Sequence, residues 1–304
     1  MKDTLLLVSH GTVDELDDLA AFVTNVRRGH APSAEVVAEL RRRYEAIGGQ
    51  SPLNAINAQL ADKLAVRLGV RVAWANRLWK PTVREVLTRL ASEGVRRVAV
   101  LPLAQHSARV YADDAREAAE GTGIELTCAP DWGQSPALCE AFAGRVLYEL
   151  SGGADLAHTT VVMTAHSLPL AAIAAGDAYE AELRAAAERV AAIVRKRLGH
   201  DVRCVVAFQS QGMSAGPGGK PVEWLGPDLK TTLDEAAARG DKRVVLAPIG
   251  FLADHVEILY DLDIEAAAMA KERGLRFARA HSLNASDDLV HVLADVARPL
   301  LGQG

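Results

Sequence analysis

Residues 160–169, TVVMTAHSLP, predict a buried strand that ends in a polar turn. The run 160–165 is apolar and β-branched, as in a strand covered on both faces, and Ser-Leu-Pro turns the chain away after His166. Residues 4–12, TLLLVSHGT, repeat the pattern and place His10 after the first strand of the chain. The two segments therefore predict the first strand of each of two similar halves.

Short apolar runs alternate with longer Ala-, Arg-, Glu- and Leu-rich stretches of helical period along the chain. This alternation is typical of βαβ units, in which helices cover both faces of a parallel sheet. The predicted strands are 4–9, 70–74, 98–103, 124–129, 160–165, 204–209, 243–249 and 275–279. The predicted helices are 34–47, 53–68, 81–93, 112–120, 136–149, 178–197, 227–238, 255–272 and 286–300. We expect an α/β protein with two similar Rossmann-like domains, each a four-stranded parallel sheet flanked by helices.

Length and internal similarity predict where the chain divides. At roughly 150 residues per domain, a chain of this length favours two domains. Within them, VAVLPLAQHS at 98–107 parallels VVLAPIGFLAD at 244–254. We expect an N-terminal domain over 1–133 and a C-terminal domain over 134–304, whose last helix could also pack back on the first domain. Loops at the carboxyl ends of the parallel strands would then line a cleft between the domains.

Composition and charge exclude several classes of protein. With 49% hydrophobic and 24% charged residues the chain is not a disordered protein, and its formal net charge of -5 disfavours a nucleic-acid partner. The start MKDTLLLVSHGT has four consecutive apolar residues, fewer than the roughly 7–15 of a signal-peptide core. No run approaches the roughly 18–20 apolar residues of a membrane span. Cys128, Cys139 and Cys204 show no C-x-x-C spacing, so we expect a cytoplasmic protein without disulfides.

Three common nucleotide and hydrolase signatures are missing from the sequence. The first strand is not followed by G-x-G-x-x-G, and the chain contains neither a Walker lysine motif nor a G-x-S-x-G elbow. Dinucleotide binding, NTP binding and α/β-hydrolase chemistry are therefore disfavoured.

Residues 250–268, GFLADHVEILYDLDIEAAA, follow a buried strand and are the part of the chain richest in candidate ligands. Glu257, Asp261 and Glu265 recur every fourth residue, which places them on one face of the predicted helix. Like charges at this spacing destabilise a helix by about 0.2–0.5 kcal/mol per pair unless a cation lies opposite. The row indicates a site for a metal, protons or a basic partner, with a solvated acidic face as the alternative. Asp254 equally fits a helix N-cap.

His166 becomes a candidate functional residue if it lies close to His255 and Glu257. A histidine at a strand end is usually satisfied by ordinary hydrogen bonds. If the strand before Phe251 lies beside the strand before His166, however, His166 faces His255 and Glu257 across one crevice. Imidazole and carboxylate together suit a borderline divalent ion such as Fe(II), and histidine also takes up protons near neutral pH.

Ordered motifs over nearly the whole chain resemble the ferrochelatase family, the enzymes that insert Fe(II) into a porphyrin. The motifs are TAHSLP (164–169), GDAY (176–179), QS (209–210), WLGPDL (224–229) and PIGFLADHVEILYDLDIE (248–265). The stretch NVRRGHAPSAEVVAELRRRYEAIGGQSPL (25–53) is similar to the soluble Gram-positive type. The resemblance implies the chelatase fold, a porphyrin clamped between the domains and Fe(II) as substrate. It implies no organic cofactor, and we expect no iron–sulfur cluster and a monomer.

The resemblance also implies roles for individual residues. His166 and Glu257 would meet the metal and the pyrrole nitrogens. We assign His166 as the base that removes the pyrrole protons, and Glu257 as its partner or a metal ligand. Asp254 and His255 would support this pair. Glu257 would also begin the acidic row that handles metal or protons. The other members of that row are Asp261 and Glu265. The positions expected to line the porphyrin, or to back residues that do, are Arg27, Arg28, Arg43, Ser51, Tyr111, Trp224 and Phe251.

Three features depart from the Gram-positive type. His10 stands where that type has tyrosine, and Val-Ser-His-Gly looks like the small cobalt and nickel chelatases, in which this histidine holds the metal. His10 is therefore a candidate metal ligand, with a histidine bonded to its own loop as the alternative. Residues 211–224 contain an apparent insertion, and the loop at 103–107 is about one residue short.

Two other functions remain open on the sequence. The nearest is a cobalt or nickel chelatase for another tetrapyrrole, and a more distant one is a porphyrin or haem carrier without activity. Coproporphyrin III and protoporphyrin IX both remain candidate substrates. The four propionates of coproporphyrin need several cations and hydroxyl groups, which Arg27, Arg28, Ser51 and Tyr111 could supply, so we favour coproporphyrin.

Overall fold

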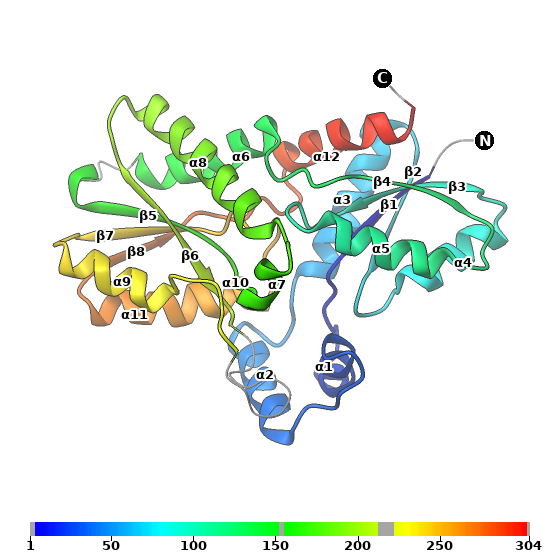
Figure 1. The fold of residues 1–304 in the computed structure, drawn as a ribbon, viewed down its shortest axis with the longest axis horizontal. Coiled ribbons are helices and arrows are strands. Elements are labelled where there is room, and N and C mark those ends of the chain that lie inside the picture. The colour runs from blue at the N-terminus through cyan, green and yellow to red at the C-terminus, as the bar shows by residue number, and fades with distance from the viewer. Residues whose placement is uncertain (1–3, 152–154, 212–221, 303–304) are drawn as a thin grey trace. The chain divides into compact units, whose positions relative to one another are not determined.

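The computed structural model describes residues 4–151, 155–211 and 222–302, and its chain forms two compact units (Figure 1). Unit 1 comprises Met1–Trp132, Ala253–Val256 and Asn284–Gly304, and unit 2 comprises Gly133–Leu252 and Glu257–Leu283. The chain thus returns to unit 1 twice after leaving it, whereas the sequence-based division has one break between 133 and 134. The insertion expected within 211–224 falls mostly on 212–221, outside the described residues.

Unit 1 contains a four-stranded parallel sheet in the order β2-β1-β3-β4. Its strands are β1 (Thr4–Ser9), β2 (Arg71–Asn76), β3 (Arg97–Pro102) and β4 (Glu125–Cys128). All six residues of β1 are buried, as its continuous apolar sequence predicts for a strand covered on both faces. The sheet confirms the predicted architecture of the first half.

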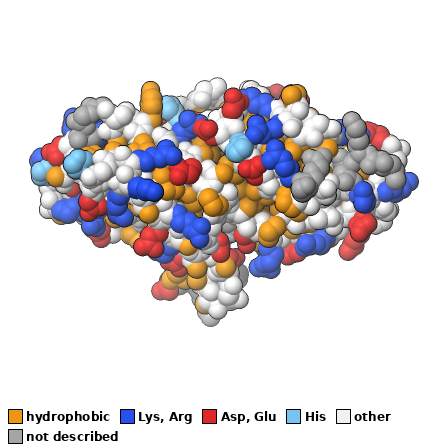
Figure 2. Space-filling view, turned by 90° about the horizontal axis from the view of Figure 1, so that it is seen from above, with side chains coloured by type: hydrophobic (Ala, Val, Ile, Leu, Met, Phe, Trp, Pro, Cys, Tyr) orange, Lys and Arg blue, Asp and Glu red, His pale blue; other side chains and the backbone are white. Residues whose placement is uncertain are grey.

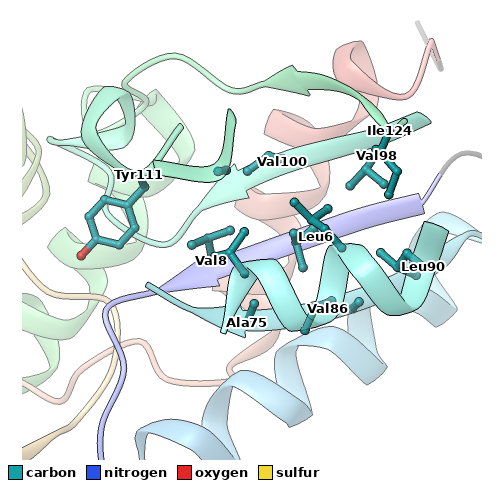
Figure 3. Close-up of a cluster of buried hydrophobic side chains, with 13 residues drawn as sticks. Leu6, Val8, Ala75, Val86, Leu90, Val98, Val100, Tyr111 and Ile124 are labelled. Atoms are coloured by element: carbon teal, nitrogen blue, oxygen red, sulfur yellow. The ribbon is translucent and has the colours of Figure 1, made fainter. Parts of the chain in front are cut away.

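Helices cover both faces of this sheet. They are α3 (Leu53–Leu68), α4 (Val83–Ser92), α5 (Ala108–Ala119) and α12 (Asp287–Leu300). Figure 3 shows Leu6 and Val8 of β1 directed at Val86 and Leu90 of α4, and all four side chains are fully or almost fully buried. Alternation along the strand sends the neighbouring leucines to the opposite face, where α3 and α12 pack on each other. The helix α4 begins at a capping box in which Thr82 and Glu85 bond each other's backbone amides.

Two helices of unit 1 pack on each other away from its sheet (Figure 1). One is α2 (Ala34–Ala46), and the other is α1 (Leu19–Val26), which follows a short 3-10 turn over Leu16–Asp18. Phe22 of α1, Tyr44 of α2 and Trp79 form a buried cluster here. The sequence did not predict α1, because its eight residues are too short and too apolar to show a clear helical period.

Unit 2 repeats the plan of unit 1, with a parallel sheet in the order β6-β5-β7-β8. Its strands are β5 (Thr159–His166), β6 (Arg203–Gln209), β7 (Arg243–Ala247) and β8 (Arg276–Arg279). The helices on its faces are α6 (Pro136–Leu150), α8 (Tyr179–Leu198), α9 (Leu229–Ala238) and α11 (Ala267–Glu272), with the short α7 (Leu170–Ala174) after β5. Figure 1 shows α6 and α8 above this sheet and α9 and α11 below it. The matching strand order confirms the predicted similarity of the two halves.

The predicted continuous helix over 255–272 is wrong. The segment consists of one turn of α10 (Val256–Leu259), a π-helical stretch over Asp261–Ala266, hereafter the π segment, and α11. The backbone N–H groups of Ile264 and Glu265 both donate to the carbonyl oxygen of Tyr260, at 3.2 and 3.0 Å. The second of these bonds spans five residues and widens the turn. Glu257, Asp261 and Glu265 therefore do not form the evenly spaced row that an α-helix would give.

Several charged side chains on the surface pair with a side chain of opposite sign. Arg116 bonds Asp113 at 2.7 Å and Arg184 bonds Glu180 at 2.8 Å, both one helical turn apart. Figure 2 shows Lys and Arg interspersed with Asp and Glu on the face in view. Exposed pairs of this kind contribute about 0–1 kcal/mol each. Among the described residues, none of the helices combines the length and hydropathy needed to cross a bilayer.

The turn after β7 passes directly against β5 at Gly250. The Gly250 N–H donates to the carbonyl oxygen of Thr164 at 3.0 Å. A Cβ atom at Gly250 would lie 2.4 Å from the Cβ of Ala165 and 2.7 Å from its Cα. Contacts this short do not occur between real side chains, so the crossing requires glycine at this position.

We expect Gly250→Ala to lower the free energy of unfolding by about 1–3 kcal/mol, because one methyl group must displace buried backbone. Gly144→Ala is the matched control, since Gly144 lies inside α6 of the same unit and a Cβ there meets nothing within 4 Å. Removing a helical glycine raises stability by about 0.5–1 kcal/mol. Urea denaturation measures both effects. Equal stabilities of the two variants would contradict the steric role of Gly250.

His106 is a buried histidine in the loop between β3 and α5. Its side chain is 5% exposed, and burial lowers its pKa to about 4. The imidazole therefore stays neutral in the folded protein at pH values where the unfolded chain takes up a proton. Because the unfolded state binds more protons, stability falls as the pH drops from about 6.5 towards 4.

The titration of His106 predicts a pH-dependent stability. Between pH 7 and pH 5 the wild-type chain should lose about 2 kcal/mol more unfolding free energy than His106→Gln, whose amide does not titrate in this range. Urea denaturation of both proteins at the two pH values gives the difference directly. Parallel losses in the two proteins would show that His106 does not contribute.

Candidate functional site

The carboxyl edge of the sheet in unit 2 brings together residues that are distant in sequence. β5 ends at His166 and β6 at Gln209, and these two residues are register partners. The turn that follows β7 crosses β5 at Gly250, and the chain then reaches Glu257. In open α/β sheets this edge is where ligands bind.

His166 and Glu257 form a pair in unit 2. The Nε2 atom of His166 lies 3.9 Å from Oε2 of Glu257, and the two side chains are 37% and 33% exposed. Nδ1 of His166 is hydrogen-bonded to the carbonyl oxygen of Ser167, and the Tyr179 hydroxyl donates to the carbonyl oxygen of His166 at 3.0 Å. Because a carbonyl only accepts, Nδ1 carries a proton and the neutral ring has its lone pair on Nε2. The arrangement presents a proton acceptor next to a carboxylate that can stabilise the resulting cation.

Asp261 and Glu265, the other two members of the predicted acidic row, are not arranged as that row predicts. Asp261 is 6% exposed, and its carboxylate accepts a hydrogen bond from the Ser210 hydroxyl. Glu265 is half-buried on the π segment. In the described parts of the chain, no three His, Cys, Asp or Glu side chains lie close enough to hold a metal ion. His166 and Glu257 therefore come together as a pair within unit 2.

Asp254 and His255 belong to unit 1. The amide nitrogen of Asp254 donates to Oδ1 of Asn284, and Nδ2 of Asn284 donates back to the Asp254 carboxylate, both at 2.8 Å. Nδ1 of His255 lies 3.2 Å from the carbonyl oxygen of Ala253. Asn284 has a left-handed backbone with φ of 49° and was not predicted as a functional residue. It lies in the SLN sequence at 282–284, but its contact with Asp254 spans 30 residues and left no periodic signal.

His10 follows β1 in unit 1 and is exposed. Its Nδ1 atom lies 3.4 Å from the Tyr111 hydroxyl, and its ring meets Phe22 edge-on at a centroid distance of 6.5 Å. The Arg77 guanidinium lies 5.3 Å from the centre of the Tyr111 ring and pairs with Asp114. Two predicted residues, His10 and Tyr111, therefore meet at the carboxyl edge of this sheet.

The other predicted porphyrin residues of unit 1 lie around α1 to α3. Arg27 donates from Nη1 to the carbonyl oxygen of Ala31 at 3.3 Å, and its Nε is buried without a partner among the described residues. Arg28 adopts a left-handed backbone with φ of 53°. Arg43 pairs with Glu39, and hydrogen bonds from Arg42 and Arg43 lower the pKa of Glu39 to about 2.

Ser51 precedes α3 and is 3% exposed. Its hydroxyl oxygen accepts a hydrogen bond from the Leu53 amide at 3.4 Å. Its oxygen therefore supports the start of a helix in this structure.

Trp224 and Phe251 lie in unit 2. Trp224 pairs through its backbone with Pro169, and the Leu225 amide donates to the carbonyl oxygen of Leu168 at 2.9 Å. This ties the WLGPDL motif to the turn after His166. The indole Nε1 of Trp224 is buried without a partner in the described residues. Phe251 packs against the core on the α9 and α11 side of the sheet.

The three cysteines are free and lie on separate elements, β4, α6 and β6. Burial raises the pKa of Cys128 and Cys139, and raises that of Cys204 to about 11. The thiols therefore stay protonated at neutral pH, a form that binds metal poorly.

Solved structures of chelatases share the fold. "SirB from Bacillus subtilis with Fe3+" superposes with a TM-score of 0.61 at 12% identity, over 99% of this chain and 96% of that one. CbiX, described as the terminal enzyme for biosynthesis of siroheme in denitrifying bacteria, gives 0.55 at 14% identity, over 97% and 98%. At these identities the likeness shows the fold alone, and it confirms the predicted chelatase architecture.

Sequence comparison identifies the family. The ferrochelatase of Herpetosiphon aurantiacus is 35% identical, covering 97% of this chain and 98% of that protein, and the ferrochelatase of Thermus thermophilus is 33% identical over 96% and 97%. The coproporphyrin III ferrochelatase of Anoxybacillus flavithermus is 34% identical over 96% and 94%. The family model for ferrochelatase matches residues 2–300. With nearly its full length matched and the chelatase fold in both halves, the chain belongs to the ferrochelatase family.

Proposed function

We propose that this chain inserts Fe(II) into coproporphyrin III, with His166 and Glu257 as the residues that act on the inner protons and the metal. As a member of the ferrochelatase family, it catalyses the insertion of Fe(II) into a porphyrin in haem biosynthesis. The observation that carries the assignment of residues is the 3.9 Å approach of His166 Nε2 and Glu257 Oε2 at the carboxyl edge of one sheet.

Proton removal is the step that His166 is suited to perform. A free porphyrin holds two N–H protons at its centre, and both must leave as one Fe(II) enters. The carbonyl of Ser167 holds the imidazole so that the Nε2 lone pair accepts a pyrrole proton. The Glu257 carboxylate stabilises the imidazolium. The proton then passes to solvent, because the His166 side chain is 37% exposed, and the neutral ring can accept the second proton.

Metal entry requires a bent ring, because the nitrogen lone pairs of a planar porphyrin point at one another. Binding contacts at the rim of the ring can offset distortion of about 1–5 kcal/mol. Glu257 can offer a carboxylate oxygen to Fe(II) while the pyrrole nitrogens replace its water ligands. A pair of protein groups suits a metal that must leave the protein within the product.

Coproporphyrin III carries four propionates, which need cations around the ring. Arg27 and Arg28 lie in a turn of unit 1, where Arg27 is half-buried and Arg28 is exposed. Arg43 is already paired with Glu39, which makes it a weaker candidate. Relatives at 31–34% identity are named coproporphyrin III ferrochelatases, and this supports the same substrate here.

Replacing His166 tests the proposal. In anaerobic assays with Fe(II), His166→Ala should lower kcat by about 10²–10⁴-fold, because the base is lost. The exposed His200 of the same unit provides the control, and His200→Ala should keep wild-type turnover. The wild-type enzyme, assayed with both porphyrins, should show the higher kcat/KM with coproporphyrin III. Near-normal turnover of His166→Ala would refute the assignment of His166 as the base. A higher kcat/KM with protoporphyrin IX would refute the proposal that coproporphyrin III is the substrate.

His10 provides a separate prediction about the metal. The residue is exposed beside Tyr111, and we propose that its imidazole contributes to metal selection. His10→Tyr should then change the ratio of kcat/KM values among Fe(II), Co(II) and Zn(II) by about tenfold, since imidazole favours the later metals. The KM for porphyrin should stay the same. An unchanged ratio of the three metals would exclude His10 from the path of the ion.

A further inference from the structure

Gln209 makes a contact that none of the assigned roles uses. It is the last residue of β6 and the register partner of His166 on β5, so both side chains lie on the same face of the sheet. The Gln209 side chain is 3% exposed, and its Nε2 donates to the carbonyl oxygen of Glu257 at 3.1 Å. One strand end thus carries His166, and the adjacent strand end holds the backbone of Glu257.

We propose that Gln209 is a positioning residue that sets the distance between His166 and Glu257. The inference rests on the roles proposed above for these two residues. α10 has only four residues and continues into the π segment, so its own hydrogen bonds hold Glu257 less firmly than a long helix would. The buried amide of Gln209 supplies this constraint from the sheet.

Ser210, the residue after Gln209, makes a second contact with the segment that carries Glu257. Its backbone is left-handed, with φ of 56°, a conformation that costs energy for any residue with a side chain. In this conformation the Ser210 hydroxyl donates a hydrogen bond to the buried carboxylate of Asp261. Asp261 lies four residues after Glu257. Consecutive residues at the end of β6 therefore hold two consecutive turns of the segment that carries Glu257.

Thr164 provides a matched control on the same face of the sheet. It lies two residues before His166 on β5 and is fully buried. Its hydroxyl has no hydrogen-bond partner among the described residues. Thr164→Val preserves the shape of the side chain and breaks no bond to Glu257. This variant therefore measures how kcat responds when a buried polar group near His166 is lost while the contact with Glu257 is kept.

The first experiment compares Gln209→Met and Gln209→Glu with Thr164→Val. Methionine keeps the length of glutamine without the donor, and glutamate places an acceptor opposite the Glu257 carbonyl. Both variants should lower kcat with Fe(II) and coproporphyrin III by about 10- to 100-fold, the usual effect of misplacing a reacting group. The KM for porphyrin should change less than twofold, and Thr164→Val should keep wild-type kcat. Wild-type kcat in the Gln209 variants would overturn the proposal. So would a large fall in Tm with a raised KM, which marks a general structural role.

The second experiment repeats Gln209→Met in a Glu257→Gln background. If Gln209 acts through Glu257, the added substitution should lower kcat less than twofold there. The same 10- to 100-fold loss in both backgrounds would show that Gln209 acts elsewhere. Full activity of Glu257→Gln alone would instead refute the catalytic pair in the proposed function. The two failures are therefore distinguishable.

Discussion

The close crossing of Gly250 over β5 is the constraint on which the site depends. Only an absent side chain allows the chain leaving β7 to run against Ala165 while its N–H bonds Thr164. This crossing starts the segment that leads to Glu257, and His166 lies two residues beyond Thr164 on the strand being crossed. A buried steric requirement in the sheet thus brings an imidazole and a carboxylate to one edge, although they are 91 positions apart in the sequence.

His166 and Glu257 are held in place by hydrogen bonds but remain partly exposed to solvent. The Ser167 carbonyl orients His166, and the Gln209 amide holds the backbone of Glu257, yet about a third of each side chain remains exposed. In the proposed function His166 is the base, and a base must be reachable by the proton that it removes, which partial exposure permits. The described residues contain no group of three His, Cys, Asp or Glu side chains that could hold a metal ion.

Much of the fold was predictable because each strand is a short apolar run between helices of regular period. All eight predicted strands occur in the described structure, in two sheets of the same order. The helix over 255–272 was wrong, because residue spacing does not reveal a π turn held by contacts such as Ser210 with Asp261. His166 and Glu257 could be paired from motifs, whereas the contact of Gln209 with Glu257 depends on strand register. Asn284 went unpredicted because its partner Asp254 is distant in sequence.

A double-mutant cycle on His166 and Glu257 tests most directly whether the two residues act as one unit. Turnover of Fe(II) and coproporphyrin III would be measured for His166→Ala, Glu257→Gln and the double variant. Residues that act together show strongly non-additive losses. We expect the double variant to be about as active as the weaker single variant. Losses that multiply in the double variant would contradict a shared role for the pair.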